Sequence, residues 1–170
     1  GNMWVKWIRR LEFGDKPYMT REETSKYTDL LTDGKARMFT WVMEAKSVVT
    51  SPSPEKPILN KGIQQLRGLA WSGKGKIKRV DVSLDGGKNW RTAQLHAPIM
   101  SKSLVRFTLP FEWSGEELLI QSRAIDETGY VQPYIQELQK IRGKNSIYHN
   151  NSIATWLVSK SGKVDNVRLG

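Results

Sequence analysis

Alternating apolar and polar residues in the middle of the chain predict β-strands, because successive side chains of a strand point to opposite faces. In the stretch 78–84, Val80, Val82 and Leu84 share one face and polar side chains occupy the other. A short apolar run at 66–71 precedes this stretch, and the glycine-containing segment 72–75 separates the two. The pattern predicts two strands joined by a turn.

A second turn follows at Asp85-Gly86-Gly87, whose glycines accept the positive φ angles that tight hairpin turns require. Residues 90–95 then form the predicted returning strand. Strand, turn, strand, hairpin and strand in succession indicate a β-sheet and no helix in this part of the chain.

Further strands are predicted on both sides of this centre, at 38–50, 103–109, 116–126 and 152–158. Thr20 and Glu23 have the spacing of a helix capping box, so the stretch 19–31 is either a short helix or an ordered surface loop. About seven short strands at this spacing are typical of an immunoglobulin-like antiparallel β-sandwich. We therefore expect an all-β sandwich, with N- and C-terminal extensions that wrap around it.

The chain has 170 residues and no cysteine, which suits a single domain with a sizeable core and no disulfide bonds. The paired prolines of Ser51-Pro52-Ser53-Pro54 interrupt regular structure. We therefore divide the chain into an N-terminal extension or linker, residues 1–50, and a sandwich domain, residues 51–170. No initiating Met precedes the opening Gly1-Asn2, so we interpret these residues either as the start of a fragment of a longer protein or as residues left over from expression cloning.

The formal net charge of +10 has two interpretations, a solvated cationic surface or long-range attraction of an anionic partner. The basic residues are scattered, and the densest group, at 74–79, lacks the interleaved aromatic residues that accompany nucleic-acid binding. We therefore expect no nucleic-acid partner. No apolar run is long enough for a membrane span, and no signal peptide opens the chain.

Common catalytic motifs are absent: the sequence contains no HExxH, GxSxG, Walker loop or GxGxxG. The two histidines lack metal-ligand spacing; His96 is predicted in a loop, and His149 in a polar run before the last strand. Trp71 and Trp90, two of the seven tryptophans, suit either core packing or a sugar-stacking surface. From the residues alone the chain is a binding or structural module, and a freestanding carbohydrate- or polyanion-binding sandwich stays an alternative.

An ordered series of motifs resembles the C-terminal dimerisation domain of the sulfite oxidase family of molybdenum enzymes. The series consists of Lys6-Trp7-Ile8, Gly68-Leu69-Ala70-Trp71-Ser72-Gly73, the segment from Arg79 to Trp90 (RVDVSLDGGKNW), and Ala124-Ile125-Asp126 followed by Val131-Gln132-Pro133. Within the family, the segments 19–31 and 145–156 resemble the branch formed by the molybdenum subunit of bacterial sulfane dehydrogenases.

The resemblance implies an immunoglobulin-like domain that pairs with its twin as a homodimer. It also implies a periplasmic parent enzyme, a molybdenum-dependent sulfite or sulfane dehydrogenase, whose molybdopterin cofactor is held by a preceding domain of the same chain through a cysteine thiolate. The parent would oxidise sulfite, or sulfane sulfur on a sulfur-carrier protein, and pass electrons to a c-type cytochrome. The present chain is then expected to hold no cofactor or metal and to be inactive alone.

The resemblance also implies one contact with the substrate. Ile141-Arg142-Gly143 matches an Arg-Gly pair that precedes the last strand in the sulfite oxidases, where the arginine reaches the anion pocket. A guanidinium suits this role because it offers a planar fork of donors to oxyanions. We therefore predict Arg142 and His149 at the edge of a substrate pocket, with Asn150 beside them and no catalytic residue in this chain. The alternative for Arg142 is a surface residue on a loop.

Overall fold

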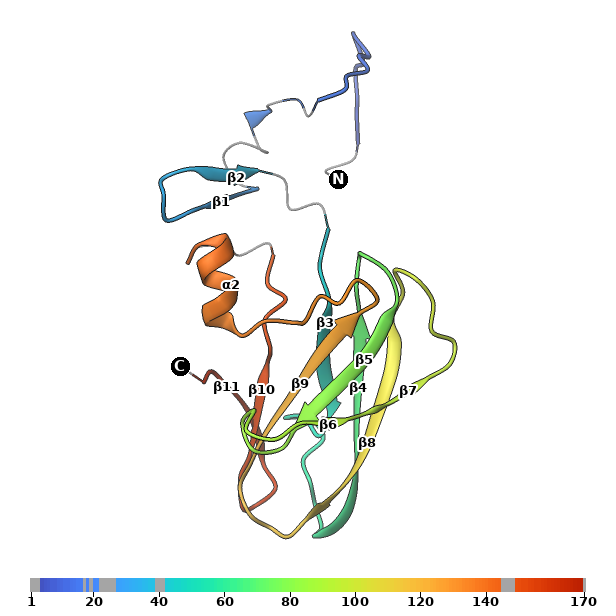
Figure 1. Cartoon of the computed structure of the whole chain (residues 1–170), viewed down its shortest axis with the longest axis vertical. Coiled ribbons are helices and arrows are strands. Elements are labelled where there is room, and N and C mark those ends of the chain that lie inside the picture. The colour runs from blue at the N-terminus through green and yellow to red at the C-terminus, as the bar shows by residue number, and fades with distance from the viewer. Residues whose placement is uncertain are drawn as a thin grey trace.

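The structure, a computed structural model, describes residues 4–16, 18, 20–21, 27–38, 42–144 and 149–169. Two antiparallel sheets packed face to face make up its main body, and a hairpin and a helix lie together at one end of them (Figure 1). The all-β sandwich predicted from the alternating pattern is confirmed.

Within the described residues, one sheet has the strand order β11-β10-β9-β5-β6 and the other has the order β3-β4-β8-β7. The strands of the sandwich are β3 Lys46–Ser51, β4 Gly62–Trp71, β5 Ile77–Ser83, β6 Arg91–Thr92, β7 Gln94–His96, β8 Val105–Trp113, β9 Leu118–Asp126, β10 Thr155–Val158 and β11 Val164–Val167. The hairpin pairs β1 (Thr28–Leu30) with β2 (Ala36–Met38), and the helix is α2 (Ile135–Arg142).

The core lies between the two sheets, where alternate residues of facing strands are buried. Leu66 on β4 and Phe107 on β8 face Val80 on β5 and Ile120 on β9, and all four are completely buried. Burying each such side chain contributes about 1.5–3 kcal/mol. The alternation that predicted strands at 78–84 and 103–109 therefore reflects the burial that stabilises the sandwich.

The predicted returning strand at 90–95 is wrong in one respect, because the chain changes sheets within it. β6 pairs with β5 in one sheet, whereas β7 pairs with β8 in the other. Buried Ala93 lies at the crossing, and its N–H donates to the Val80 carbonyl at 2.8 Å. A side chain as small as alanine fits into the close-packed space between the sheets. His96, predicted in a loop, is the last residue of β7, and its Nε2 lies 2.7 Å from Thr108 Oγ1.

The predicted strand at 38–50 is also divided. β2 ends at Met38, residues 42–45 have no regular structure, and β3 begins at Lys46. β3 pairs with β4, so the predicted boundary at residue 50 falls inside a strand of the sandwich. The division into an extension and a sandwich domain stays a prediction. The capping box proposed for 19–31 depends on Glu23, which lies outside the described residues.

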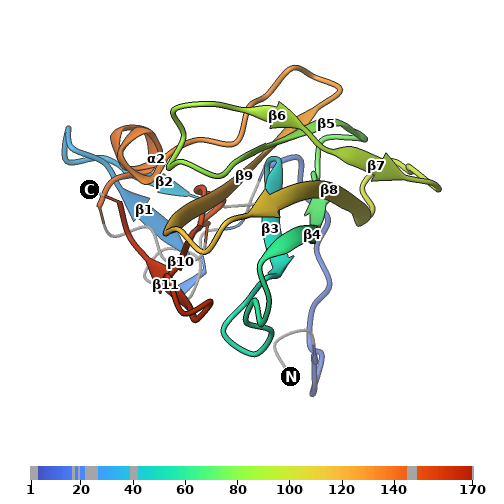
Figure 2. The same cartoon turned by 90° about the horizontal axis from the view of Figure 1, so that it is seen from below.

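The helix α2 and the strand β11 were not predicted. α2 begins after Pro133, where the Glu137 carboxylate accepts the backbone N–H of Tyr134 at 3.1 Å. Of its eight residues only Leu138 and Arg142 are buried, and one of these is charged, so the helix has no continuous apolar face that the sequence could reveal. α2 packs beside the β1–β2 hairpin in both views of the fold (Figure 1, Figure 2). Among the described residues, no helix has the length and apolar character needed to cross a membrane.

We expect Gly68→Ala to disrupt the packing of β4 against β8. A Cβ at Gly68 would lie 2.1 Å from Phe107 Cζ and 2.6 Å from the Val48 carbonyl oxygen, so the ring and the backbone must both move. The free energy of unfolding, measured by urea denaturation, should fall by about 3 kcal/mol.

The control for this experiment is Gly129→Ala, at a turn where a Cβ meets no atom within 4 Å but φ is +85°. Backbone strain alone should lower the free energy of unfolding of this variant by about 1 kcal/mol. Equal losses in the two variants would contradict the packing explanation.

Candidate functional site

Side chains from separate parts of the chain meet around the carboxylate of Glu44. Arg142, the last residue of α2, places Nη2 3.2 Å from Glu44 Oε2 and Nη1 3.3 Å from Oδ2 of Asp29 on β1. His149 places Nε2 2.6 Å from the same Glu44 oxygen. We call Asp29, Glu44, Arg142 and His149 the Glu44 cluster. The cluster joins the β1–β2 hairpin, the segment before β3, the end of α2 and the segment before β10.

The Glu44 cluster is shielded from water. The relative exposure is 2% for Asp29, 4% for Arg142 and 1% for His149. Burying a guanidinium is unfavourable unless carboxylates accept its hydrogen bonds, and two carboxylates do so here. Removing one partner from such a buried pair typically costs about 3–5 kcal/mol. The cluster is therefore a joint that holds α2 and the hairpin onto the sandwich.

Burial and neighbouring charges shift the ionisation of two cluster members. Burial lowers the pKa of His149, and Arg142 adds to this effect, although Glu44 and Asp29 act in the opposite direction. Burial would raise the pKa of Glu44, but its own backbone N–H together with His149, Arg142 and Lys74 outweighs burial, so the pKa of Glu44 is lowered. The surroundings thus favour the carboxylate form of Glu44 and disfavour the charged form of His149.

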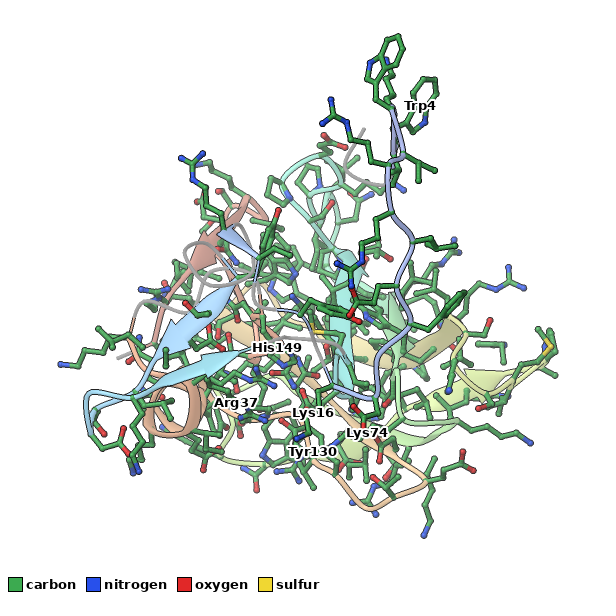
Figure 3. All side chains as sticks on the ribbon, turned by 90° about the horizontal axis from the view of Figure 1, so that it is seen from above. Trp4, Lys16, Arg37, Lys74, Tyr130 and His149 are labelled. Atoms are coloured by element: carbon green, nitrogen blue, oxygen red, sulfur yellow. The ribbon has the colours of Figure 1, made fainter. Side chains whose placement is uncertain are left out.

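Lys74 and Tyr130 form the outer edge of the cluster. Lys74 Nζ lies 3.5 Å from Glu44 Oε1 and 5.4 Å from the centroid of the Tyr130 ring. Figure 3 shows both residues in the same part of the molecule as His149 and Arg37, whose charge acts on that histidine. Lys74 and Arg37 are exposed, so the surface beside the buried cluster carries positive charge.

The structure brings the two predicted site residues together, since Arg142 and His149 contact one carboxylate. The alternative of a surface arginine on a loop is wrong, because Arg142 is buried at the end of a helix. Asn150 is exposed, and its carbonyl accepts a hydrogen bond from Lys46 Nζ. The role of Arg142 and His149 at a substrate pocket stays a prediction.

The sequence reasoning missed both acidic members of the cluster. Asp29 and Glu44 lie 113 and 98 residues from Arg142 in the chain, so no local spacing connects them. One signal was present: Glu44 is the single charged residue of the stretch 38–45, MFTWVMEA. An isolated carboxylate in a largely apolar run needs a cationic partner if the run is buried.

The side chains of this chain do not fit a molybdenum site. The sequence has no cysteine that could supply a thiolate ligand. Over the part of the chain that the structure describes, no group of three or more His, Asp or Glu side chains is placed to hold a metal ion. We therefore assign no step of a reaction to a cofactor on these residues.

Comparisons with known proteins give a consistent result. A family model described as the Mo-co oxidoreductase dimerisation domain matches residues 37–156. Sulfite oxidase of Gallus gallus is 33% identical over 143 residues, which cover 76% of this chain and 31% of that protein. The NADH nitrate reductase of Solanum lycopersicum is 36% identical over 105 residues, which cover 54% of this chain and 12% of that protein.

A solved structure extends the comparison to nearly the whole chain. The crystal structure of the sulfane dehydrogenase SoxCD from Paracoccus pantotrophus matches with a TM-score of 0.90 and 60% sequence identity, over 99% of this chain and 44% of that chain. This chain thus spans less than half of each of these relatives.

We expect the lowered pKa of His149 to make stability depend on pH. The pKa of His149 is lower in the folded chain than in the unfolded chain, where it is about 6.5. As the pH drops below that value, the unfolded chain takes up more protons than the folded one, so the free energy of unfolding falls. The urea denaturation midpoint should therefore decrease between about pH 7.5 and pH 5.5, and His149→Gln should flatten that decrease.

Glu44 should cause a separate loss of stability below its ordinary pKa of 4.5, and this loss should remain visible in His149→Gln. His96→Gln, which removes the half-buried histidine of β7, is the matched control for replacing an imidazole by an amide. A wild-type slope in His149→Gln would contradict the role given to its titration.

Proposed function

This chain belongs to the Mo-co oxidoreductase dimerisation domain family, and from that membership we propose that its parent is a molybdenum-dependent sulfite or sulfane dehydrogenase. The observation that carries the proposal is the similarity to SoxCD over almost the full length of the chain. The family resemblance predicted from the ordered motifs is confirmed, and sulfite oxidase and sulfane dehydrogenase are both relatives.

The proposed reaction is a two-electron oxidation of sulfur. With sulfite as substrate, water supplies one oxygen atom, sulfate forms, and two protons and two electrons are released. Sulfane sulfur on a sulfur-carrier protein is the other candidate substrate, and a c-type cytochrome is the proposed electron acceptor. The molybdopterin cofactor, bound by a preceding domain of the parent, would supply the two-electron chemistry. We propose a periplasmic location for this parent, in keeping with a cytochrome partner.

The N-terminal arm, residues 4–16, supports a contact with the rest of the parent chain. Trp4, Trp7 and Phe13 are 76%, 93% and 90% exposed. Large apolar side chains gathered on one exposed segment mark an interaction surface. Figure 3 shows Trp4 at the tip of the arm, away from the sandwich. We propose that the arm packs against the molybdopterin domain, as a linker from that domain would.

The Glu44 cluster is the proposed edge of the substrate pocket. A guanidinium carries five N–H donors, and the two carboxylates engage only part of this set. The same carboxylates fix the orientation of Arg142, and exposed Arg37 and Lys74 add positive charge nearby. An anionic substrate brought to this face by the preceding domain would meet oriented donors in a partly dehydrated setting, where such hydrogen bonds are strong.

The alternative of a freestanding carbohydrate-binding module gains no support from Trp71 and Trp90. The guanidinium carbon of Arg123 lies 4.1 Å from the Trp90 ring centroid, and Trp90 Nε1 donates to the Gly87 carbonyl at 3.0 Å. Trp71 is half-buried on β4. Trp90 therefore has partners within the fold and Trp71 is partly covered, so neither forms an open stacking surface.

We expect Arg142→Ala in the intact parent enzyme to raise KM for the anionic sulfur substrate at least about tenfold, because a charge-assisted contact is lost. Steady-state kinetics measures this change. Asp29→Asn is the control, since it weakens the same buried joint but leaves the guanidinium in place.

Both substitutions should lower the melting temperature, and only Arg142→Ala should raise KM strongly. An unchanged KM in Arg142→Ala would remove Arg142 from the pocket and leave it a purely structural residue. Equal KM increases in the two variants would assign the effect to the loosened joint.

We expect the parent protein to be a homodimer whose mass, measured by light scattering after size exclusion, does not change between low and high salt. Apolar interfaces are insensitive to salt, whereas contacts between exposed charges weaken as salt rises. The isolated chain of residues 1–170 should be measured at two concentrations as a second sample. A monomeric parent at all concentrations would contradict the homodimer.

A further inference from the structure

A polar cavity lies where the start of α2 meets the edge of the five-stranded sheet. It has a volume of about 210 Å³, and its walls come from β9, β10 and β11, the beginning of β3 and the segment before β10. An adjoining hollow of about 280 Å³ along α2 shares Ile135, Asn150 and Arg168 with it. No member of the Glu44 cluster lines either space, so the cavity is separate from the proposed substrate pocket.

The charges that line these two spaces are all positive. Lys46 and Arg168 line the cavity, and Lys144 lines the adjoining hollow. Among the described lining residues there is no aspartate or glutamate. In the Glu44 cluster, by contrast, Arg142 and Lys74 both reach a carboxylate.

Lys46 is the clearest case of a cation without a matching anion. Its side chain is half-buried, and its Nζ donates to the backbone carbonyl of Asn150. In the described part of the chain, no carboxylate lies within ion-pair distance of it. Burial lowers the pKa of Lys46, and no neighbouring negative charge offsets this effect. An anion in the cavity would restore the stability of the ammonium form.

Neutral donors complete the wall of the cavity. Gln121 is completely buried, and its Nε2 donates to Thr155 Oγ1 at 2.9 Å. The hydroxyl of Tyr134 donates to Gln121 Oε1 at 3.5 Å, and burial raises the pKa of this phenol, so it stays protonated. A chain of buried hydrogen bonds fixes these groups in place, which makes the polar wall rigid.

We propose that this cavity is a binding site for a small oxyanion, with Lys46 and Arg168 as its charged partners and the hydroxyl of Thr155 as a neutral donor. A water molecule occupies about 30 Å³ in the liquid, so the cavity admits a sulfate-sized or carboxylate-sized group with a few waters. The oxyanion is either a free inorganic ion or the carboxylate of a larger molecule. The proposal does not depend on the reaction of the parent enzyme.

The test is equilibrium binding to the intact parent protein, by titration calorimetry with sulfate and separately with acetate, at constant ionic strength maintained with chloride. Wild-type protein should bind at least one of the two anions saturably. Lys46→Gln should weaken that binding about tenfold or more, because one charge-assisted hydrogen bond is lost, and Arg168→Gln should also weaken it. Lys46→Arg, which keeps the charge, should retain most of the affinity.

Lys78→Gln is the matched control, since Lys78 is an exposed lysine of β5 that lines neither space. It should change the affinity less than about twofold, as expected for a screened surface charge. Equal losses of affinity in Lys46→Gln and Lys78→Gln would mean that the anion is held only by general electrostatic attraction, and this result would overturn the proposal. Preference for sulfate would identify an inorganic ion, and preference for acetate would identify a carboxylate.

Crystals of the parent soaked in selenate locate the bound anion, because selenium gives an anomalous signal. A peak beside Lys46 in the wild type that is absent from Lys46→Gln supports the proposal. Peaks confined to other parts of the parent would overturn it, even if the calorimetry shows anion binding. This readout needs no catalytic activity, so failure of the proposed oxidation and failure of the anion site are distinguishable.

Discussion

The guanidinium of Arg142 is buried, and this constraint governs how the β1–β2 hairpin and α2 lie against the sandwich. A positive charge removed from water requires carboxylates within hydrogen-bond distance, and Asp29 and Glu44 provide them. To meet this requirement, the β1–β2 hairpin, the segment before β3 and the end of α2 must converge on one point. The positive surface beside the cluster depends in part on the same convergence, because Arg37 belongs to the hairpin, whereas Lys74 comes from the β4–β5 turn and reaches Glu44 from the sandwich.

Inside the sandwich, buried polar side chains connect the two sheets. Gln132 Oε1 accepts the N–H of Ser47 on β3 at 2.8 Å and the N–H of Ala124 on β9 at 3.0 Å, so one amide bridges both sheets. Asp126, the last residue of β9, accepts a hydrogen bond from the hydroxyl of Ser72 just after β4, and it also accepts one from Thr128 in its own turn. Several of these residues belong to the motifs that identified the family. Those motifs therefore supply hydrogen-bond partners for buried backbone N–H and hydroxyl groups.

Two neighbouring regions of the molecule differ in whether carboxylates balance their positive charges. The Glu44 cluster balances Arg142 and Lys74 with carboxylates, which fixes their positions and lowers the cost of burial. The cavity beside α2 gathers Lys46 and Arg168 without an acidic lining residue among those described. The first arrangement suits a rigid edge that orients donors, and the second suits capture of an anion from solution.

The sequence by itself determined the class of fold and the family. The alternation of apolar and polar residues at 78–84 and 103–109 shows which side chains enter the core. The ordered motifs contain the turns and the polar residues that hydrogen-bond between the sheets of this fold. Tertiary structure alone decided the exchange of sheets at Ala93, the helix that ends at Arg142, and the pairing of that arginine with Glu44. These features depend on contacts between segments up to 113 residues apart, and a local pattern carries no information about which distant charge completes a buried pair.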